Sequence, residues 1–189
     1  IDTGSGEGPG EGGEPSDPEE GRAWYNIKAG AAGGHNYSGN GPALLLDQDR
    51  TMASGGEISL ALKPGTNWGV FYTYVDDNNW LYIGKDATSG WYYQYNLNGS
   101  GSYPGITGLP EFEAGDEINM TLSLNNETLA VTVNAKTVRV TNQNLISFMN
   151  QNAGKGKFGV KTNDGQISFA DFTYNGENCM EDNWGFCSD

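Results

Sequence analysis

Apolar and polar residues alternate along much of the chain after residue 21. The clearest case is EINMTLSL (117–124), whose apolar positions fall on one side of an extended chain: Ile118, Met120, Leu122 and Leu124. A period of two predicts a β-strand with one buried face. A turn at 125–127 and the alternating segment TLAVTVNA (128–135) follow. We therefore expect a β-hairpin that packs one face against a core.

The same alternation recurs in short segments on both sides of this hairpin. They are AWYNIKAG (23–30), PALLLDQD (42–49), EISLALKP (57–64), WGVFYTYV (68–75), WLYIGKD (80–86), GWYYQYNL (90–97), KTVRV (136–140), KFGVKTND (157–164) and QISFADFTYNG (166–176). Only NLISFMNQ (144–151) has the spacing of a helix, which we expect to cap one end of the fold. Many short strands joined by Gly, Asn and Asp turns predict an all-β fold. We expect a two-sheet antiparallel β-sandwich of the jelly-roll type over residues 22–176, with one short helix.

Charge is concentrated at the two ends of the chain. Of the formal net charge of −14, seven acidic residues lie in 1–20, which contain no base, and four lie in 177–189. We interpret residues 1–21 as a flexible, acidic, Gly-rich linker, because such a composition buries too little apolar surface to offset its ordering entropy. The body between these ends has 13 acids and 10 bases. It lacks a basic stripe for phosphate groups, which argues against a nucleic-acid partner.

Two further patterns bear on the setting of the protein. There is no run of eighteen apolar residues, so we expect no membrane insertion. Cys179 and Cys187 are the only cysteines and both lie in the C-terminal tail, residues 177–189. We expect them to form a disulfide, which favours a secreted or cell-surface location. A chain that opens on Ile1 and a linker indicates a module tethered to a larger multidomain protein. We expect the module itself to be monomeric.

Aromatic residues are concentrated in residues 68–95, which hold ten Trp, Tyr and Phe residues in a chain that is 12% aromatic. Large aromatic side chains dominate sandwich interiors, so any one of these rings can belong to the core. A row of exposed rings can equally hold the flat, apolar side of a sugar. The three strands are consecutive and hence expected to be neighbours. Both faces of the predicted sheet carry several aromatic rings. The sequence leaves open which of the two faces packs in the core.

Alternation favours a sugar-binding surface around residue 80. Leu81 and Ile83 take the core side of their strand, which leaves Trp80 and Tyr82 facing away from it. A soluble module rarely leaves so large an apolar patch uncovered without a use. Acidic and amide side chains nearby, including Gln94 and Asn96, can bond to sugar hydroxyls. The predicted ligand-binding residues are Trp80, Tyr82, Trp91, Tyr93, Asp76, Asp77 and Asn79, with Tyr103 at the rim.

Two longer stretches carry a resemblance to a known family. WGVFYTYVDDNNWLYIGKD (68–86) and GKFGVKTNDGQISFADFTY (156–174) resemble the laminin-G-like, concanavalin-type jelly roll. Within this family, the chain resembles the sandwich modules attached to secreted bacterial glycoside hydrolases such as endo-α-N-acetylgalactosaminidases. The resemblance implies a carbohydrate-binding module. It is more specific for fold than for function, because this fold hosts lectins, spacers and enzymes alike.

The resemblance also implies a structural calcium ion that ties the first strand to the last. Calcium takes six or more oxygen ligands from carboxylates and loop carbonyls. Asp171, in the closing SFADFTY segment, is the residue that the resemblance points to, with Asp47 and Asn36 as partners. The alternative is that Asp171 is a surface residue of the final strand.

The sequence gives little support to catalysis. A glycosidase needs two carboxylates about 5 to 9 Å apart, and the candidate pairs are Asp47/Asp49, Asp76/Asp77 and Glu111/Glu113. The second and third pairs fall in segments that read as turns. The single His35 sits in a Gly-rich loop without a serine or cysteine motif.

We therefore expect a non-catalytic carbohydrate-binding module of a secreted bacterial protein, with glycan as its partner. The alternative is a structural or protein-interaction sandwich that serves as a spacer without a sugar ligand.

Overall fold

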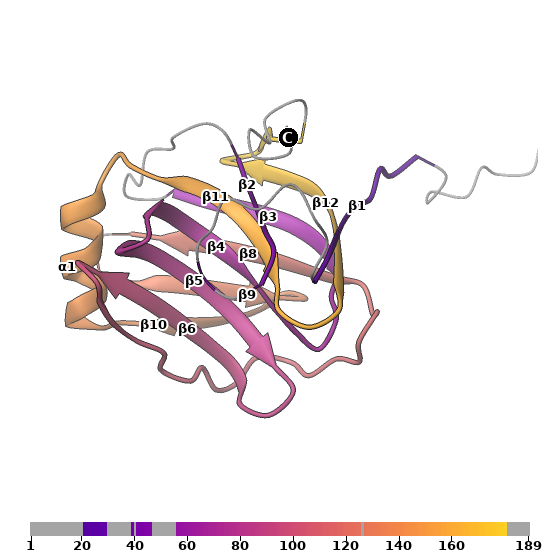
Figure 1. Cartoon of the computed structure of the whole chain (residues 1–189), viewed down its shortest axis with the longest axis horizontal. Coiled ribbons are helices and arrows are strands. Elements are labelled where there is room, and N and C mark those ends of the chain that lie inside the picture. Colours follow the sequence, from indigo (N-terminus) through magenta and orange to yellow (C-terminus); the bar gives the residue numbers. More distant parts are fainter. Residues whose placement is uncertain (1–20, 30–38, 40, 47–55, 126, 181–189) are drawn as a thin grey trace, which may run out of the picture.

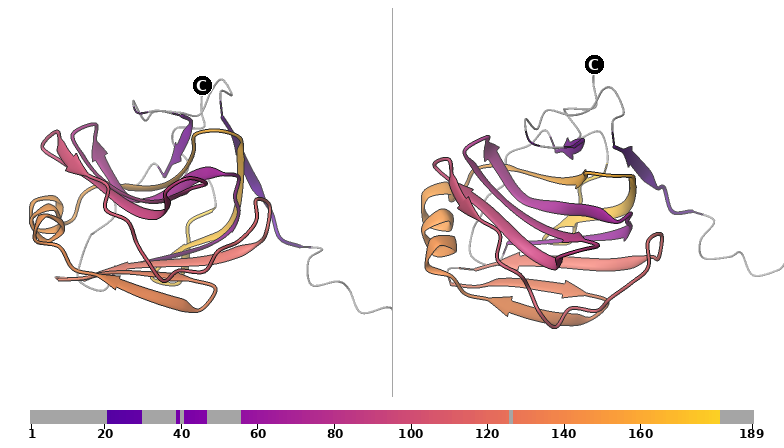
Figure 2. Two further views of the ribbon diagram at one scale, coloured as in Figure 1. Left: turned by 90° about the horizontal axis from the view of Figure 1, so that it is seen from below. Right: turned by 60° about the horizontal axis from the view of Figure 1, so that its bottom comes forward.

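The computed structural model describes residues 21–29, 39, 41–46, 56–125 and 127–180. Within this part, the strands form two antiparallel sheets that face each other (Figures 1 and 2). The seven-stranded sheet contains β1 (Tyr25–Lys28), β12 (Gln166–Tyr174), β3 (Gly56–Lys63), β8 (Ile118–Leu124), β9 (Leu129–Val133) and β10 (Lys136–Val140) in that order, and β13 (Glu177–Asn178) pairs with β12. The six-stranded sheet contains β2 (Ala43–Leu45), β11 (Lys157–Thr162), β4 (Asn67–Asp76), β5 (Asn79–Asp86), β6 (Gly90–Leu97) and β7 (Ser100–Ser102). The predicted all-β sandwich is confirmed.

The hairpin predicted from residues 117–135 forms β8 and β9. Leu122 of β8 pairs with Val131 of β9, and both side chains are fully buried. The apolar face found by alternation is thus the inner face of this sheet, because residues directly opposite one another in a pair point to the same side. At the turn beyond β9, Asn134 and Ala135 both have positive φ, as a two-residue hairpin of the type I′ class requires.

The predicted short helix is α1 (Gln143–Asn152), which closes one end of the sandwich (Figure 1). Asn142 caps it, and its side-chain oxygen accepts a hydrogen bond from Asn144 N at 2.8 Å. Leu145, Phe148 and Met149 are buried against the core. Among the described residues, no helix is long and apolar enough to cross a membrane.

One large apolar core fills the space between the two sheets. Its largest fully buried side chains include Trp68 and Tyr72 from the six-stranded sheet and Phe169 and Phe172 from the seven-stranded one. Cys179 and Met180, which follow β13, are also buried in this core. The described chain therefore continues to pack into the sandwich up to residue 180.

A second, smaller apolar cluster lies on the other side of the six-stranded sheet. It consists of Ala43, Leu45, Phe71, Trp80 and Tyr82, with Tyr74 and Tyr92 packed against it. We call this side the outer face, because it points away from the seven-stranded sheet. The strands of the six-stranded sheet are bent so that the outer face is concave (Figure 2).

Candidate functional site

The outer face carries a row of aromatic rings from three neighbouring strands. Tyr74 of β4 pairs with Trp80 of β5, and Phe71 pairs with Tyr82. The ring centroids of Phe71 and Trp80 are 6.1 Å apart and perpendicular, and those of Phe71 and Tyr82 are 5.1 Å apart. Tyr92 of β6 extends the row, with its centroid 6.0 Å from that of Tyr82. The Phe71–Trp80 contact is edge-to-face and the other two are tilted, so each ring packs against the next in a defined orientation.

Gly84 leaves space on the outer face for two rings of the aromatic row. Gly84 lies opposite Tyr92 in the β5–β6 pair. A Cβ atom on Gly84 would lie 2.6 Å from the Tyr82 ring and 2.7 Å from the Tyr92 ring. The absent side chain thus lets both tyrosines lie close to the sheet.

The outer face continues along β6 with amide groups. Tyr92, Gln94 and Asn96 alternate on this face and are all partly exposed. Gln94 lies opposite Tyr82, and Asn96 lies opposite Trp80. An aromatic ring, a carboxamide and a second carboxamide therefore stand in line, next to the buried part of the cluster.

The structure corrects the predicted grouping of the aromatic residues. Trp91 and Tyr93 were expected to share a face with Trp80 and Tyr82, but they lie opposite Lys85 and Ile83 and are each 3% exposed in the main core. The physical reason is register, since a one-residue shift between paired strands exchanges their faces. Trp91 and Tyr93 are core residues, and the β6 ring on the outer face is Tyr92.

Trp80 and Tyr82 do lie on the outer face, but they are less accessible than expected. Trp80 is 8% exposed and Tyr82 is 1% exposed. Burial raises the pKa of the neighbouring Tyr92 hydroxyl, but Tyr92 is still partly exposed. Tyr92 and Tyr74 are therefore the rings of this row with most surface available to a ligand.

The polar residues at the β4–β5 turn are partly engaged with each other. Asp76 Oδ1 accepts hydrogen bonds from Asn78 N at 2.8 Å and Asn79 Nδ2 at 3.0 Å, which is typical of a turn-forming Asp. Asp77 is exposed; its carboxylate accepts a hydrogen bond from the Tyr74 hydroxyl, and its carbonyl accepts one from Trp80 Nε1 at 3.3 Å. Of the predicted polar residues, Asp77 lies nearest to the exposed rings.

The amide of Asn79 turns toward the helix end of the sandwich. Its Oδ1 accepts hydrogen bonds from Asn98 N at 3.1 Å and Gln151 Nε2 at 3.3 Å. At the same end of the row, Asn96 Nδ2 donates to the Asp77 carbonyl at 3.0 Å. The polar groups thus form a connected border along one end of the outer face.

A buried lysine lies at the other end of the outer face. Lys161 of β11 pairs with Ala43 and Gly69, and its Nζ is 5.3 Å from the centroid of the Tyr82 ring. The side chain is almost fully buried, and this burial lowers its pKa to about 8. Pattern analysis of the sequence did not identify it, because a Lys in an alternating strand reads as a solvent-facing residue.

Tyr103 lies at the edge of the six-stranded sheet. It is 74% exposed and directly follows β7, which pairs with β6. The next residue, Pro104, accepts a hydrogen bond from Tyr93 N at 3.1 Å, so the chain continues alongside β6. This position fits a rim, and contact with a ligand there stays a prediction.

The predicted calcium site is described only in part. Asp171 has a positive φ of 54° at an irregularity of β12, and its carboxylate forms a 3.0 Å ion pair with Arg22 Nε. Within the described ranges there is no group of three or more His, Cys, Asp or Glu residues able to hold a metal ion. Asp47 and Asn36 lie outside those ranges, so the calcium site stays a prediction.

The other predicted residues can be placed briefly. Cys179 is buried, while Cys187 lies outside the described residues, and their disulfide stays a prediction. Glu111 forms a 2.7 Å ion pair with Lys85. Asp49 and His35 also lie outside the described residues.

Comparison with known proteins supports the fold. No family model matches the chain, and no curated protein matches it in sequence. The solved structures that are similar in shape include the following three. Carbohydrate-binding module CBM66 from Bacillus subtilis has a TM-score of 0.56 at 12% identity, covering 80% of this chain and 94% of its own. Congerin II with lactose and MES bound has a TM-score of 0.53 at 10% identity, with 70% and 97% covered. Sheep galectin-11 in complex with glycerol has a TM-score of 0.52 at 10% identity, with 67% and 94% covered. The chain thus shares a β-sandwich fold with carbohydrate-binding modules and lectins.

Proposed function

We propose that this protein is a non-catalytic carbohydrate-binding module of a secreted bacterial glycan-active protein, and that glycan binds on the outer face. One observation carries the proposal: the partly exposed ring of Tyr92 lies in line with the amides of Gln94 and Asn96, beside the buried Trp80 cluster. A sugar ring has an apolar C–H side that stacks on an aromatic ring. Its hydroxyl groups both donate and accept hydrogen bonds, as carboxamides do.

The structural comparisons agree with the proposal, but similarity of fold alone is not sufficient to assign the function. A fold hosts many functions, so the residues of the site have to supply the argument. The similar structures include one named as a carbohydrate-binding module and one that holds lactose. The laminin-G-like resemblance and tethering to a glycoside hydrolase belong to the same proposal. In that setting a monomeric module raises the effective concentration of a catalytic domain at its substrate.

A non-catalytic role agrees with the state of the described carboxylates near the outer face. A glycosidase needs a general acid whose pKa is raised. Although burial raises the pKa of Asp86, hydrogen bonds from the backbone N–H groups of Ser89 and Thr88 lower it overall. Asp76 is held in a turn by two hydrogen bonds.

A glycan array followed by calorimetric titration tests the proposal. We expect binding to at least one glycan, and we expect Tyr92→Ala to weaken it by about 1–3 kcal/mol, the range seen when a stacking ring is removed from a base. The matched control is Tyr25→Ala, which removes a partly exposed tyrosine from the seven-stranded sheet. Binding to no glycan would favour the spacer alternative. Equal losses for both variants would place the ligand elsewhere.

A further inference from the structure

The chain that follows β7 continues along the edge of β6 without a change of register. Gly101 of β7 lies opposite Asn96, and Gly105 lies opposite Tyr92. Equal numbers of residues separate the two pairs on each strand, so Tyr103 lies opposite the β6 residue midway between them. Residues directly opposite one another point to the same side of a sheet. The Tyr103 side chain is therefore directed to the outer face, at its edge.

The backbone on both sides of Tyr103 is held in this position. Ser102 pairs with Tyr95, and Tyr93 N donates to the Pro104 carbonyl at 3.1 Å. A proline also restricts the residue before it to extended conformations. The Tyr103 side chain is nevertheless 74% exposed, more than any other large apolar side chain among the described residues. Because the backbone is already ordered, binding through this ring has a lower entropic cost.

Gln94 is the β6 residue opposite Tyr103, and it lies between two rings. Tyr82 of β5 is opposite it on the other side, and the Gln94 side chain is partly exposed. Tyr92 lies diagonally from Tyr103, and residues related in this way are about 7–8 Å apart. A single sugar ring is shorter than this separation, so the two tyrosines match two successive sugar units. The carboxamide between them can donate and accept hydrogen bonds with hydroxyl groups of either unit.

The edge of the sheet beside Tyr92 is open. Gly105 lies opposite Tyr92 and has no side chain to stand beside the Tyr92 ring. A Cβ atom on Gly105 would have one neighbour within 4 Å, the Trp91 carbonyl oxygen at 3.8 Å. A glycan chain that lies on Tyr92 can therefore continue over the edge of the sheet, toward Tyr103.

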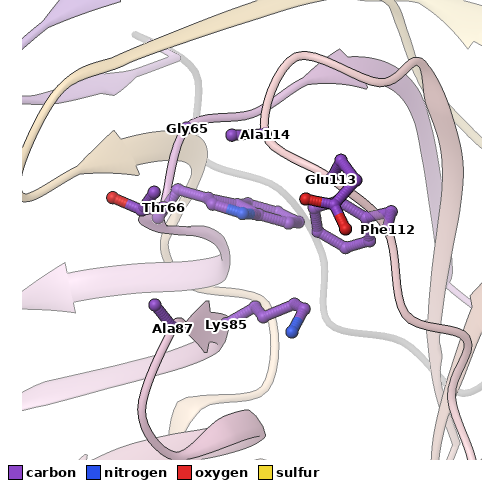
Figure 3. Close-up of a pocket in the computed structure, with 8 residues that line it drawn as sticks. Gly65, Thr66, Lys85, Ala87, Phe112, Glu113 and Ala114 are labelled. Atoms are coloured by element: carbon purple, nitrogen blue, oxygen red, sulfur yellow. The ribbon is translucent and has the colours of Figure 1, made fainter.

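The strands that form this edge carry no charged side chain. Residues 87–110, which include β6, β7 and the segment with Tyr103, contain no Asp, Glu, Lys, Arg or His. Lys161 lies on β11, which β4 and β5 separate from β6. By contrast, a cleft beside the β3–β4 turn is lined by Lys85 and Glu113 (Figure 3). The β6 edge thus offers no counter-charge to an acidic sugar, and the carboxylates near the row, Asp77 and Asp86, would repel one. This favours a neutral glycan.

We propose that the outer face binds a neutral oligosaccharide of at least two sugar units, with one unit on Tyr92 and the next on Tyr103, and that the glycan leaves the concave face over the β6 edge. This inference rests on the proposed function and adds the class and the length of the ligand. The two tyrosines then have different roles. Tyr92 contacts every bound glycan, and Tyr103 contacts only those that are long enough to reach the edge.

Calorimetric titration against oligosaccharides of increasing length tests this inference. The probes have one to four units of glucose, galactose or fructose, and oligogalacturonides of the same lengths serve as the acidic series. In a neutral series that binds, we expect the affinity to rise at least about tenfold from one unit to two. The acidic series should bind more weakly. Equal affinity for one unit and for two, or tighter binding of the acidic series, would overturn the inference.

Substitutions at the edge separate the two units. Tyr103→Ala should remove the gain in affinity between one unit and two, and leave the affinity for one unit unchanged. Tyr103→Phe is the matched control, because it keeps the ring and should keep the gain. Gly105→Val places a side chain opposite Tyr92, in the open space at the edge, and should weaken the binding of two units or more. A gain that survives Tyr103→Ala would show that the second unit does not lie on Tyr103.

The two proposals fail in different ways. If no glycan of any series binds, the proposed function is wrong, and this inference is wrong with it. If glycans bind and Tyr92→Ala weakens them at every length, but Tyr103→Ala changes none of the affinities, the outer face is still the glycan site. In that case only the extended ligand over the β6 edge is wrong.

Discussion

Lys161 shows how strongly the outer face changes the chemistry of a single residue. Its ammonium group lies near the Tyr82 ring, which favours the charged form, but the side chain is nearly removed from water. Burial dominates and lowers its pKa to about 8. A buried charge that depends on a ring for part of its stabilisation makes this position sensitive to pH.

We expect Lys161 to destabilise the fold below pH 8 and to stop doing so at higher pH. In the unfolded chain a lysine has a pKa of about 10.4, so between pH 8 and 10.4 the unfolded state binds more protons. The free energy of unfolding contributed by this residue therefore rises with pH in that window. Lys161→Met should be more stable than the parent at pH 7, by on the order of 3 kcal/mol at most, and this advantage should shrink toward pH 10. Urea unfolding at a series of pH values measures it.

The control for this prediction is Lys157→Met. Lys157 lies on the same strand and is more exposed, so its replacement removes one positive charge from β11 with a smaller change in burial. An advantage of Lys161→Met that stays constant from pH 7 to pH 10 would contradict the assigned burial effect.

The two faces of β6 have different roles: one packs in the main core, and the other forms part of the outer face. Trp91, Tyr93 and Tyr95 pack in the main core, while Tyr92, Gln94 and Asn96 lie on the outer face. The hydroxyls of Tyr93 and Tyr95 accept hydrogen bonds from Asn142 and Asn144 at the start of α1, at 3.0 and 2.9 Å. Buried tyrosines need such partners, so the helix end and the core face of β6 stabilise each other.

Substitutions at two adjacent residues of β6 should therefore affect different properties of the protein. Trp91→Ala removes a buried ring and should lower the free energy of unfolding by about 3–5 kcal/mol. Tyr92→Ala should lower it by about 1 kcal/mol or less, because the ring is partly exposed, and should act mainly on glycan binding. Denaturant unfolding and glycan titration of both variants check this. A Trp91→Ala protein as stable as the parent would contradict the core position of Trp91.

The sequence pattern was sufficient to predict the fold, but not to predict which residues lie on the outer face. The alternation around Leu122 and the apolar spacing of α1 are local signals, and both predictions are confirmed. Which ring of β6 joins Trp80 depends on how residues 80–86 pair with 90–97, and that is set by the turn between them. The sequence of Trp91, Tyr92 and Tyr93 is compatible with either face. The packing of the Trp68 ring against Phe112, with ring centroids 5.9 Å apart, has no sequence signal at all, because the two residues lie more than forty positions apart.

The two sheets of the sandwich share one core. Its members alternate between sheets, and the sheets are joined by strands such as β11 and β12, which follow each other in the chain but lie in different sheets. Neither sheet can keep its inner face buried without the other. A domain of this size with a single core is expected to unfold cooperatively.

A destabilising substitution in one sheet should therefore also lower the urea midpoint at which the other sheet unfolds. Three of the five tryptophans, Trp68, Trp80 and Trp91, lie in the six-stranded sheet, so tryptophan fluorescence follows mainly that sheet. Leu122→Ala opens a cavity in the seven-stranded sheet, where the side chain is fully buried, and should cost about 2–5 kcal/mol. In urea, fluorescence and far-ultraviolet circular dichroism should shift to the same lower midpoint. A fluorescence midpoint that stays at the parent value while the dichroism midpoint falls would show that the sheets unfold separately, and that the core does not join them.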